Sequence, residues 1–142
     1  MRSNNNFKLN GIIPMVYCFF NKNGSIDKHL MRDQIRSISK MKISAIAALG
    51  LGTEVNKLSF NEKKLIIEII SKERKNLPLA LTIQGKNKEE YIKLIDLAKN
   101  NNADWIILQP LIKKGSSDIS CFNFFITILP YCAGTLVGIQ NA

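Results

Sequence analysis

The residues best suited to chemistry lie in one short stretch, Ser44–Ser59 (SAIAALGLGTEVNKLS). Its first half is almost continuously apolar, which is typical of a parallel strand buried on both faces. Gly50 and Gly52 then interrupt the strand, and a hydroxyl and a carboxylate follow at Thr53 and Glu54. Glycine adopts backbone angles closed to other residues and lets a ligand approach the main chain. The stretch therefore predicts a ligand-binding loop at the end of a buried strand.

A helix is expected directly after this loop. Ser59 and Glu62 have the spacing of a capping box, in which each side chain satisfies a free backbone amide of the other. The order strand, loop, helix then recurs along the chain. The expected strands are Gly11–Phe20, Ser44–Gly50, Leu77–Ile83, Ala103–Pro110 and Thr135–Asn141. The helices between them are expected to start at Asp27, Phe60, Asn87 and Asp118, the last capped by Asp118 and continuing through Phe122, Phe125 and Leu129.

This repetition predicts a parallel α/β architecture with right-handed crossovers. An open doubly wound sheet is one solution, but the sequence has neither G-x-G-x-x-G nor a Walker phosphate loop. The other is part of an eight-stranded (β/α)8 TIM barrel, which normally needs about 250 residues. With 142 residues, we predict a polar N-terminal segment at 1–10 and an incomplete barrel at 11–142, with four strand-helix units and a fifth strand. Its unpaired edges favour self-association.

Composition narrows the function classes. The hydrophobic and charged shares, 46% and 22%, are typical of a soluble globular protein. The net charge of +9 is spread over the predicted helix faces, so we expect no nucleic-acid partner. No apolar stretch approaches the roughly 20 residues of a membrane helix, and 1–6 is polar, so we expect a cytoplasmic protein without a membrane partner.

The cysteines predict neither a metal site nor a disulfide framework. Cys18, Cys121 and Cys132 lack C-x-x-C spacing, and the chain has one histidine, His29, at an expected exposed position. We therefore expect buried free thiols and no metal.

Several of these segments occur together in one known family. They are Gly11–Pro14 opening the first strand, Asn23–Asp27 before its helix, Gly50–Glu54 followed by Leu58-Ser59, Pro110, and Gln140-Asn141. In this order and spacing the chain resembles the N-terminal half of the dihydrodipicolinate synthase and N-acetylneuraminate lyase family. These are class I aldolase-type lyases built on a (β/α)8 barrel.

The resemblance implies a lyase or aldolase that acts on an α-keto acid such as pyruvate without a cofactor, commonly as a homo-oligomer. The family forms a Schiff base between the keto carbonyl and a lysine on the sixth strand. The predicted strands stop at the fifth, so no catalytic residue is assigned. The lysines near predicted strand ends, Lys57, Lys86, Lys113 and Lys114, are expected to be solvated on loops.

The resemblance also locates the substrate loop. The family's two threonines there correspond to Leu51 and Gly52, and Thr53 lies one place later. Gly52 and Thr53 are therefore the expected substrate contacts. The tyrosine that relays protons corresponds to Ile112, and an isoleucine cannot transfer a proton.

Three functions remain open at this point. The first is a divergent, truncated aldolase or lyase that is inactive alone. The second is a non-catalytic barrel remnant or binding module that lacks the threonine-tyrosine relay. The third, a basic nucleic-acid-binding domain, rests on charge alone and predicts binding that weakens steeply with salt.

Overall fold

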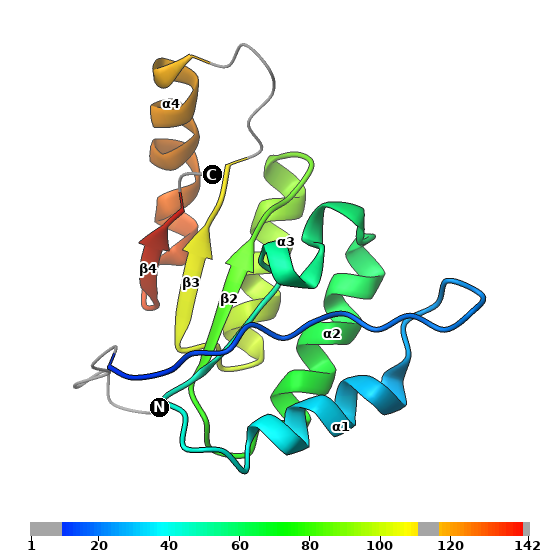
Figure 1. Cartoon of the computed structure of the whole chain (residues 1–142). Helices are drawn as coiled ribbons and strands as arrows, with labels where there is room; N and C mark the ends of the chain where they lie inside the picture. Colours follow the sequence, from blue (N-terminus) through cyan, green and yellow to red (C-terminus); the bar gives the residue numbers. More distant parts are fainter. Residues whose placement is uncertain (1–9, 111–116, 141–142) are drawn as a thin grey trace.

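The computed structural model describes residues 10–110 and 117–140, which form a parallel sheet backed by helices (Figure 1). Within these residues the sheet has four strands in the order β1-β2-β3-β4. The strands are β1 (Ile46–Ala48), β2 (Leu79–Ile83), β3 (Trp105–Leu108) and β4 (Leu136–Ile139). Sequential strands pair in parallel, so a helix must return the chain between each pair.

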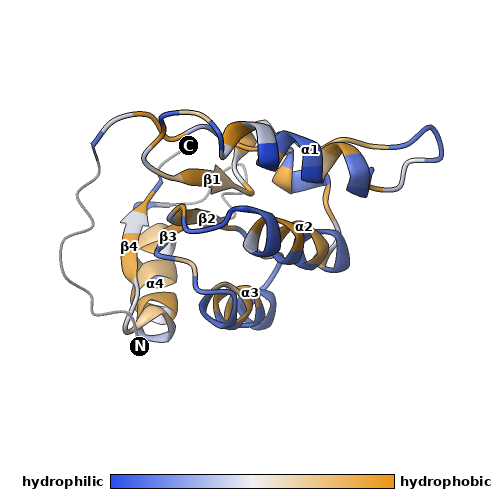
Figure 2. Cartoon of the chain, turned by 90° about the horizontal axis from the view of Figure 1, so that it is seen from below, coloured by the Kyte–Doolittle hydropathy of each residue, from blue (hydrophilic) through white to orange (hydrophobic). Residues whose placement is uncertain are grey.

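The helices lie along one side of the sheet, where Figure 2 shows α2, α3 and α4 side by side. The long helices are α1 (Lys28–Ile38), α2 (Phe60–Glu73), α3 (Lys88–Asn100) and α4 (Asp118–Ile128). Three short 3-10 turns are η1 (Leu51–Thr53), η2 (Val55–Lys57) and η3 (Leu129–Cys132). The predicted alternation of strands and helices is confirmed in this region.

Local capping sets the helix starts. The predicted capping box is present, since Glu62 donates its N–H to the Ser59 hydroxyl and accepts the Ser59 N–H at 2.7 Å. Asn87 caps α3 by accepting the Glu90 N–H at 2.9 Å. The expected cap of α4 was wrong by one residue. Ser117, not Asp118, accepts the free N–H of the first turn.

The first predicted strand, 11–20, is not a regular strand. The N-terminal segment (residues 10–20) makes a single isolated parallel bridge, between Met15 and Ala47. Pro14, just before the bridge, has no N–H to donate to a ladder. Just after the bridge, the Tyr17 N–H and carbonyl are both hydrogen-bonded to the Gln34 side chain, at 2.9 Å each. The segment therefore runs beside β1 but leaves the ladder after one bridge, so the expected count of five strands is wrong for the described residues.

The two faces of the sheet differ in what covers them. Alternate residues face the helices and are fully buried: Leu81, Ile83, Ile106 and Leu108. The opposite face carries the intervening residues, among them Thr82, Trp105 and Gly138. There the Trp105 ring lies so close to Gly138 that a Cβ would stand 2.9 Å from Nε1. In a complete barrel this second face is the interior.

The last helix and strand leave apolar side chains uncovered. Phe122 is 63% exposed, whereas the neighbouring Phe124 lies edge-on against Tyr91, with ring centroids 4.8 Å apart. On the outermost strand Leu136 and Ile139 are also exposed. This edge has the character of an interface that is not filled within the described part of the chain.

Candidate functional site

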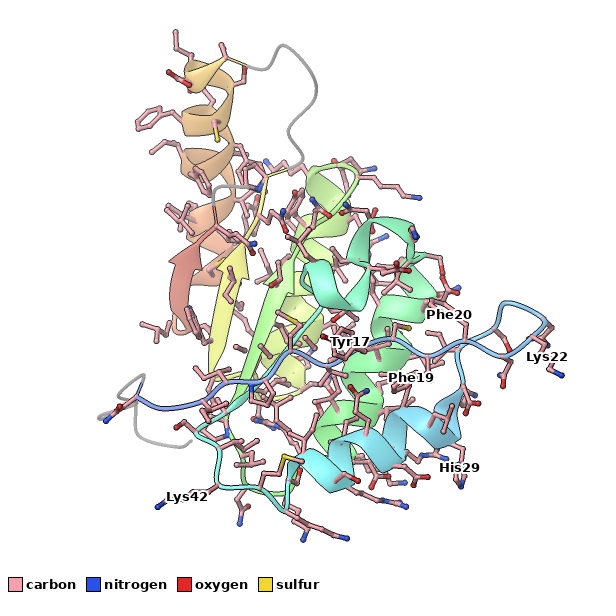
Figure 3. The ribbon with its side chains drawn as sticks, viewed as in Figure 1. Tyr17, Phe19, Phe20, Lys22, His29 and Lys42 are labelled. Carbon is pink, nitrogen blue, oxygen red and sulfur yellow. The ribbon has the colours of Figure 1, made fainter. Side chains whose placement is uncertain are left out.

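The candidate site lies where the parallel strands end. The carboxyl ends of β1, β2, β3 and β4 meet at one edge of the sheet, and the segments after them bring residues 49–58, 84–87, 109 and 140 to that edge (Figure 1). In parallel α/β folds the loops at this edge carry the ligand site. His29 lies elsewhere, in the first turn of α1, and is exposed at the surface, as expected (Figure 3).

The turn after β1 uses its glycines for space. Gly50 has φ −91°, and the left-handed conformations of this turn fall on Leu49 (φ 61°) and Glu54 (φ 55°). A Cβ on Gly50 would lie 2.6 Å from the Met15 methyl, and one on Gly52 would lie 3.0 Å from Met15 Cγ. These two glycines are therefore not needed for left-handed backbone angles, contrary to that part of the expectation. They let the N-terminal segment pack directly on the turn.

Thr53 fastens this turn to the N-terminal segment. Its hydroxyl donates to the Val16 carbonyl at 2.6 Å and accepts the Leu49 N–H at 3.0 Å, and the residue is 0% exposed. A hydroxyl has one proton to donate, so Thr53 can donate to a ligand only by giving up its bond to Val16. The Thr53 hydroxyl is thus engaged by the protein itself.

The exposed part of the turn carries Leu51 and Glu54. Leu51, at the position of a relay threonine in the family it resembles, is 62% exposed and offers no hydrogen-bonding group. Glu54 pairs with Lys57 at 3.1 Å in solvent. Gly52 is half-buried between them, so its main chain remains within reach of a ligand. Ile112, with Lys113 and Lys114, lies outside the described residues.

A buried lysine, not expected from the sequence, supports the neighbouring loop. Lys63 on α2 donates to the Gln84 carbonyl at 2.9 Å and to Glu90 at 3.1 Å. Glu90 also accepts the Lys86 N–H at 3.1 Å. Although burial acts to raise the pKa of Glu90, these donors lower it overall. Lys63 lies three residues before Ile66, on the apolar face of α2, and that spacing is the signal that could have identified it.

Two of the cysteines have a raised thiol pKa. Burial, together with the nearby carboxylates of Glu62 and Glu54, raises the pKa of Cys18 to about 11. Burial also raises the pKa of Cys132. Cys132 is buried as expected, whereas Cys18 and Cys121 are only partly buried. A thiol with a raised pKa is a poor nucleophile at neutral pH.

Among residues 10–110 and 117–140, no three metal-ligating side chains gather into a group that could hold an ion. Nor does any helix in those residues have the length and apolar character needed to cross a bilayer.

Three glutamines stand at the same level of the sheet edge. Ile83, Leu108 and Ile139 are in register, and Gln84, Gln109 and Gln140 each follow one of them. The ladder continues through this level, because Gln109 donates its N–H to the Ile83 carbonyl at 3.2 Å and Gln140 to the Leu108 carbonyl at 3.0 Å. We call Gln84, Gln109 and Gln140 the glutamine row. The glutamine row becomes visible only when strands 20 to 30 residues apart in the chain are aligned side by side. The sequence alone does not give that alignment.

Comparison with known proteins identifies the family of this chain. A model of the dihydrodipicolinate synthetase family matches residues 8–133. The chain belongs to this family. The resemblance predicted from the sequence is therefore confirmed.

Individual relatives agree with the family match. A 4-hydroxy-tetrahydrodipicolinate synthase from Methanothrix thermoacetophila is 29% identical over 98 residues, covering 69% of this chain and 33% of the relative. YagE from Escherichia coli K12, a dihydrodipicolinic acid synthase family protein solved in complex with pyruvate, superposes with a TM-score of 0.83 at 25% identity. That superposition covers 94% of this chain and 45% of YagE.

The fold match extends to N-acetylneuraminate lyase from Mycoplasma synoviae, with a TM-score of 0.84 at 24% identity, over 93% of this chain and 46% of that one. The chain thus spans less than half the length of the structures it matches and about a third of the curated relative. The parallel sheet with helices on one side is accordingly part of a TIM-barrel fold.

Proposed function

We propose that the chain forms the N-terminal half of an aldolase or lyase that acts on an α-keto acid such as pyruvate through a lysine Schiff base. The observation that carries this proposal is the superposition on YagE, a family member solved with pyruvate, over 94% of this chain. The turn after β1 and the strand ends beside it are the parts of this chain that would face such a ligand.

In this proposal the chain supplies binding surface. The half-buried main chain of Gly52 meets the ligand, and Thr53 holds the turn in place through Val16 and Leu49. Thr53 is thus a positioning residue whose loss would move Gly52. Of the two contacts expected from the sequence, Gly52 would thus meet the ligand directly, and Thr53 would act through the backbone of the turn.

The Schiff-base amine would come from outside the described residues. A lysine that attacks a carbonyl must first lose its proton, and the imine it forms then accepts the electrons of the breaking C–C bond. Lys57 and Lys86 are exposed to solvent, and Lys63 is held in its pair with Glu90. None of these three is placed to serve as the nucleophile, so we expect residues 1–142 alone to form no imine.

Borohydride trapping tests this proposal. Residues 1–142 incubated with pyruvate and borohydride should gain no mass, whereas a chain completed with the remaining barrel units should gain one reduced pyruvate on a lysine. Pyruvate should also shift the amide signal of Gly52 in residues 1–142, and lactate, which lacks the keto group, serves as the control. If the completed chain is not trapped and Gly52 does not respond to pyruvate, the proposal is wrong.

A second candidate is a non-catalytic binding module on the same scaffold. The observation that favours it is Leu51, an exposed side chain without a hydroxyl on the substrate turn. It predicts that pyruvate shifts Gly52 while the completed chain forms no adduct. Successful trapping would rule it out.

We further propose that the protein is a cytoplasmic homo-oligomer. Its support is the uncovered apolar edge formed by α4 and β4, where Phe122 and Ile139 are exposed. Sedimentation of residues 1–142 should show association, and a monomer over the whole concentration range would contradict this.

A further inference from the structure

The glutamine row faces the interior side of the sheet. Leu81, Ile83 and Leu108 pack in the core beneath the helices, so strand alternation places Gln84 and Gln109 on the opposite face. By the same alternation Gln140 follows Gly138, on the face where the Trp105 ring lies. The three carboxamides therefore share one face and one level at the carboxyl ends of three neighbouring strands.

The row is buried to an unusual degree for amide side chains. Gln109 is 5% exposed and Gln84 8%, while Gln140 at the outer strand is half-buried. Neighbouring strands stand about 4.8 Å apart, close enough for stacked carboxamides to hydrogen-bond one another. A ladder of three carboxamides would form two such hydrogen bonds.

Within the described residues, the central side chain of the row has an oxygen without a partner. The side-chain oxygen Oε1 of Gln109 is inaccessible to solvent and receives no hydrogen bond within the described part of the chain. A buried acceptor without a donor is costly, and native structures retain few of them. Among the described residues Ser39 Oγ and Arg74 Nε are likewise buried without a partner, whereas other amide side chains are satisfied. The Gln34 amide, for example, uses both its oxygen and its nitrogen on the Tyr17 backbone.

We propose that Gln109, flanked by Gln84 and Gln140, is a specificity-determining residue that accepts a hydrogen bond from a hydroxyl group of the ligand. A carboxamide is neutral and both donates and accepts, which matches a hydroxyl better than a carboxylate or an ammonium group. This inference rests on the proposed function for the presence of a keto acid at this edge. It adds that the site prefers a keto acid with a hydroxyl beyond the keto group.

The test compares hydroxypyruvate with pyruvate on residues 1–142, following the side-chain amide signals of the glutamines by NMR. Hydroxypyruvate should bind about fivefold more tightly, the value of one net neutral hydrogen bond. Q109L should abolish that preference and leave the affinity for pyruvate unchanged. A preference that survives Q109L would overturn the inference while leaving the proposed function intact.

Stability gives a second readout, independent of the keto acid. Because Q109L removes an unpaired buried acceptor, the free protein should keep or raise its melting temperature. The matched control Q34L removes a fully paired amide and should lower it. A Q109L variant as destabilised as Q34L would mean that Gln109 is structural.

If neither keto acid binds to residues 1–142, the trapping experiment on the completed chain decides the proposed function, and glycerol decides this inference alone. A shift of the Gln109 side-chain signal by glycerol would support the hydroxyl site, and no shift would overturn it.

Discussion

Replacing Thr53 with valine tests the hydrogen bonds that hold the turn after β1 in place. The substitution keeps the branched shape and removes the hydroxyl, which donates to the Val16 carbonyl at 2.6 Å and accepts the Leu49 N–H at 3.0 Å. Because Thr53 is 0% exposed, water cannot take its place. Two buried backbone groups therefore lose their partner.

The magnitude follows from these two groups. Each buried group left without a partner costs about 1–3 kcal/mol, so T53V should lower the free energy of unfolding by about 2–6 kcal/mol. That is a large part of the roughly 5–15 kcal/mol of a typical domain. Part of the cost could be relieved if Leu49 leaves its left-handed conformation (φ 61°), which itself stores strain of about 1–3 kcal/mol.

Urea unfolding followed by far-UV circular dichroism measures this cost. T53S is the matched control, because it keeps the hydroxyl and loses one methyl group, for about 1 kcal/mol. We expect T53V to be the less stable of the two. The hydroxyl does not hold the turn as described if the free energy of unfolding of T53V lies within about 0.5 kcal/mol of the wild-type value, or exceeds that of T53S.

Three further predictions concern other groups at this edge. K63M should lower the free energy of unfolding by about 3–5 kcal/mol in urea, because it leaves the Glu90 carboxylate without its cation, and the double variant K63M/E90L should recover part of that loss. With a pKa of about 11, Cys18 should react slowly with a thiol reagent at pH 8 in the folded protein. C18S should therefore leave the number of fast-reacting thiols unchanged, and a decrease in that number would contradict this prediction. The Ser59 hydroxyl and N–H lower the pKa of Glu62 from 4.5, so the stability it adds is complete above pH 4.5 and disappears as the pH falls through the lower folded value. E62Q should therefore be less stable than the wild type at pH 7 and equal to it near pH 2, as measured by urea midpoints.

Local sequence was sufficient for the helices. Ser59 with Glu62 and Asn87 with Glu90 act within three residues of each other, so the starts of α2 and α3 were predictable without the rest of the chain. The buried face of α3 follows the same short-range logic, since side chains three and four residues apart share one face of a helix.

The N-terminal segment was mispredicted because its environment is distant. Its apolar residues favour a strand, but the Gln34 amide holds the Tyr17 backbone from α1, seventeen residues away in the chain. The sequence correctly singled out the glycines of the turn after β1, but it assigned them a need for unusual backbone angles. Only the position of Met15 against Gly50 and Gly52 shows that space, not backbone freedom, requires them.

The family, the alternation of strands and helices, and the glycine-containing turn after the first buried strand were all indicated by the sequence alone. They depend on motifs and periodicities that act within a few residues, and the family match over residues 8–133 agrees with them. Tertiary structure alone decided that the Thr53 hydroxyl points inward, that Lys63 pairs with Glu90, and that Gln84, Gln109 and Gln140 stand level. Each of these depends on the register between strands or the packing of a helix on a distant loop, and residue types do not encode register.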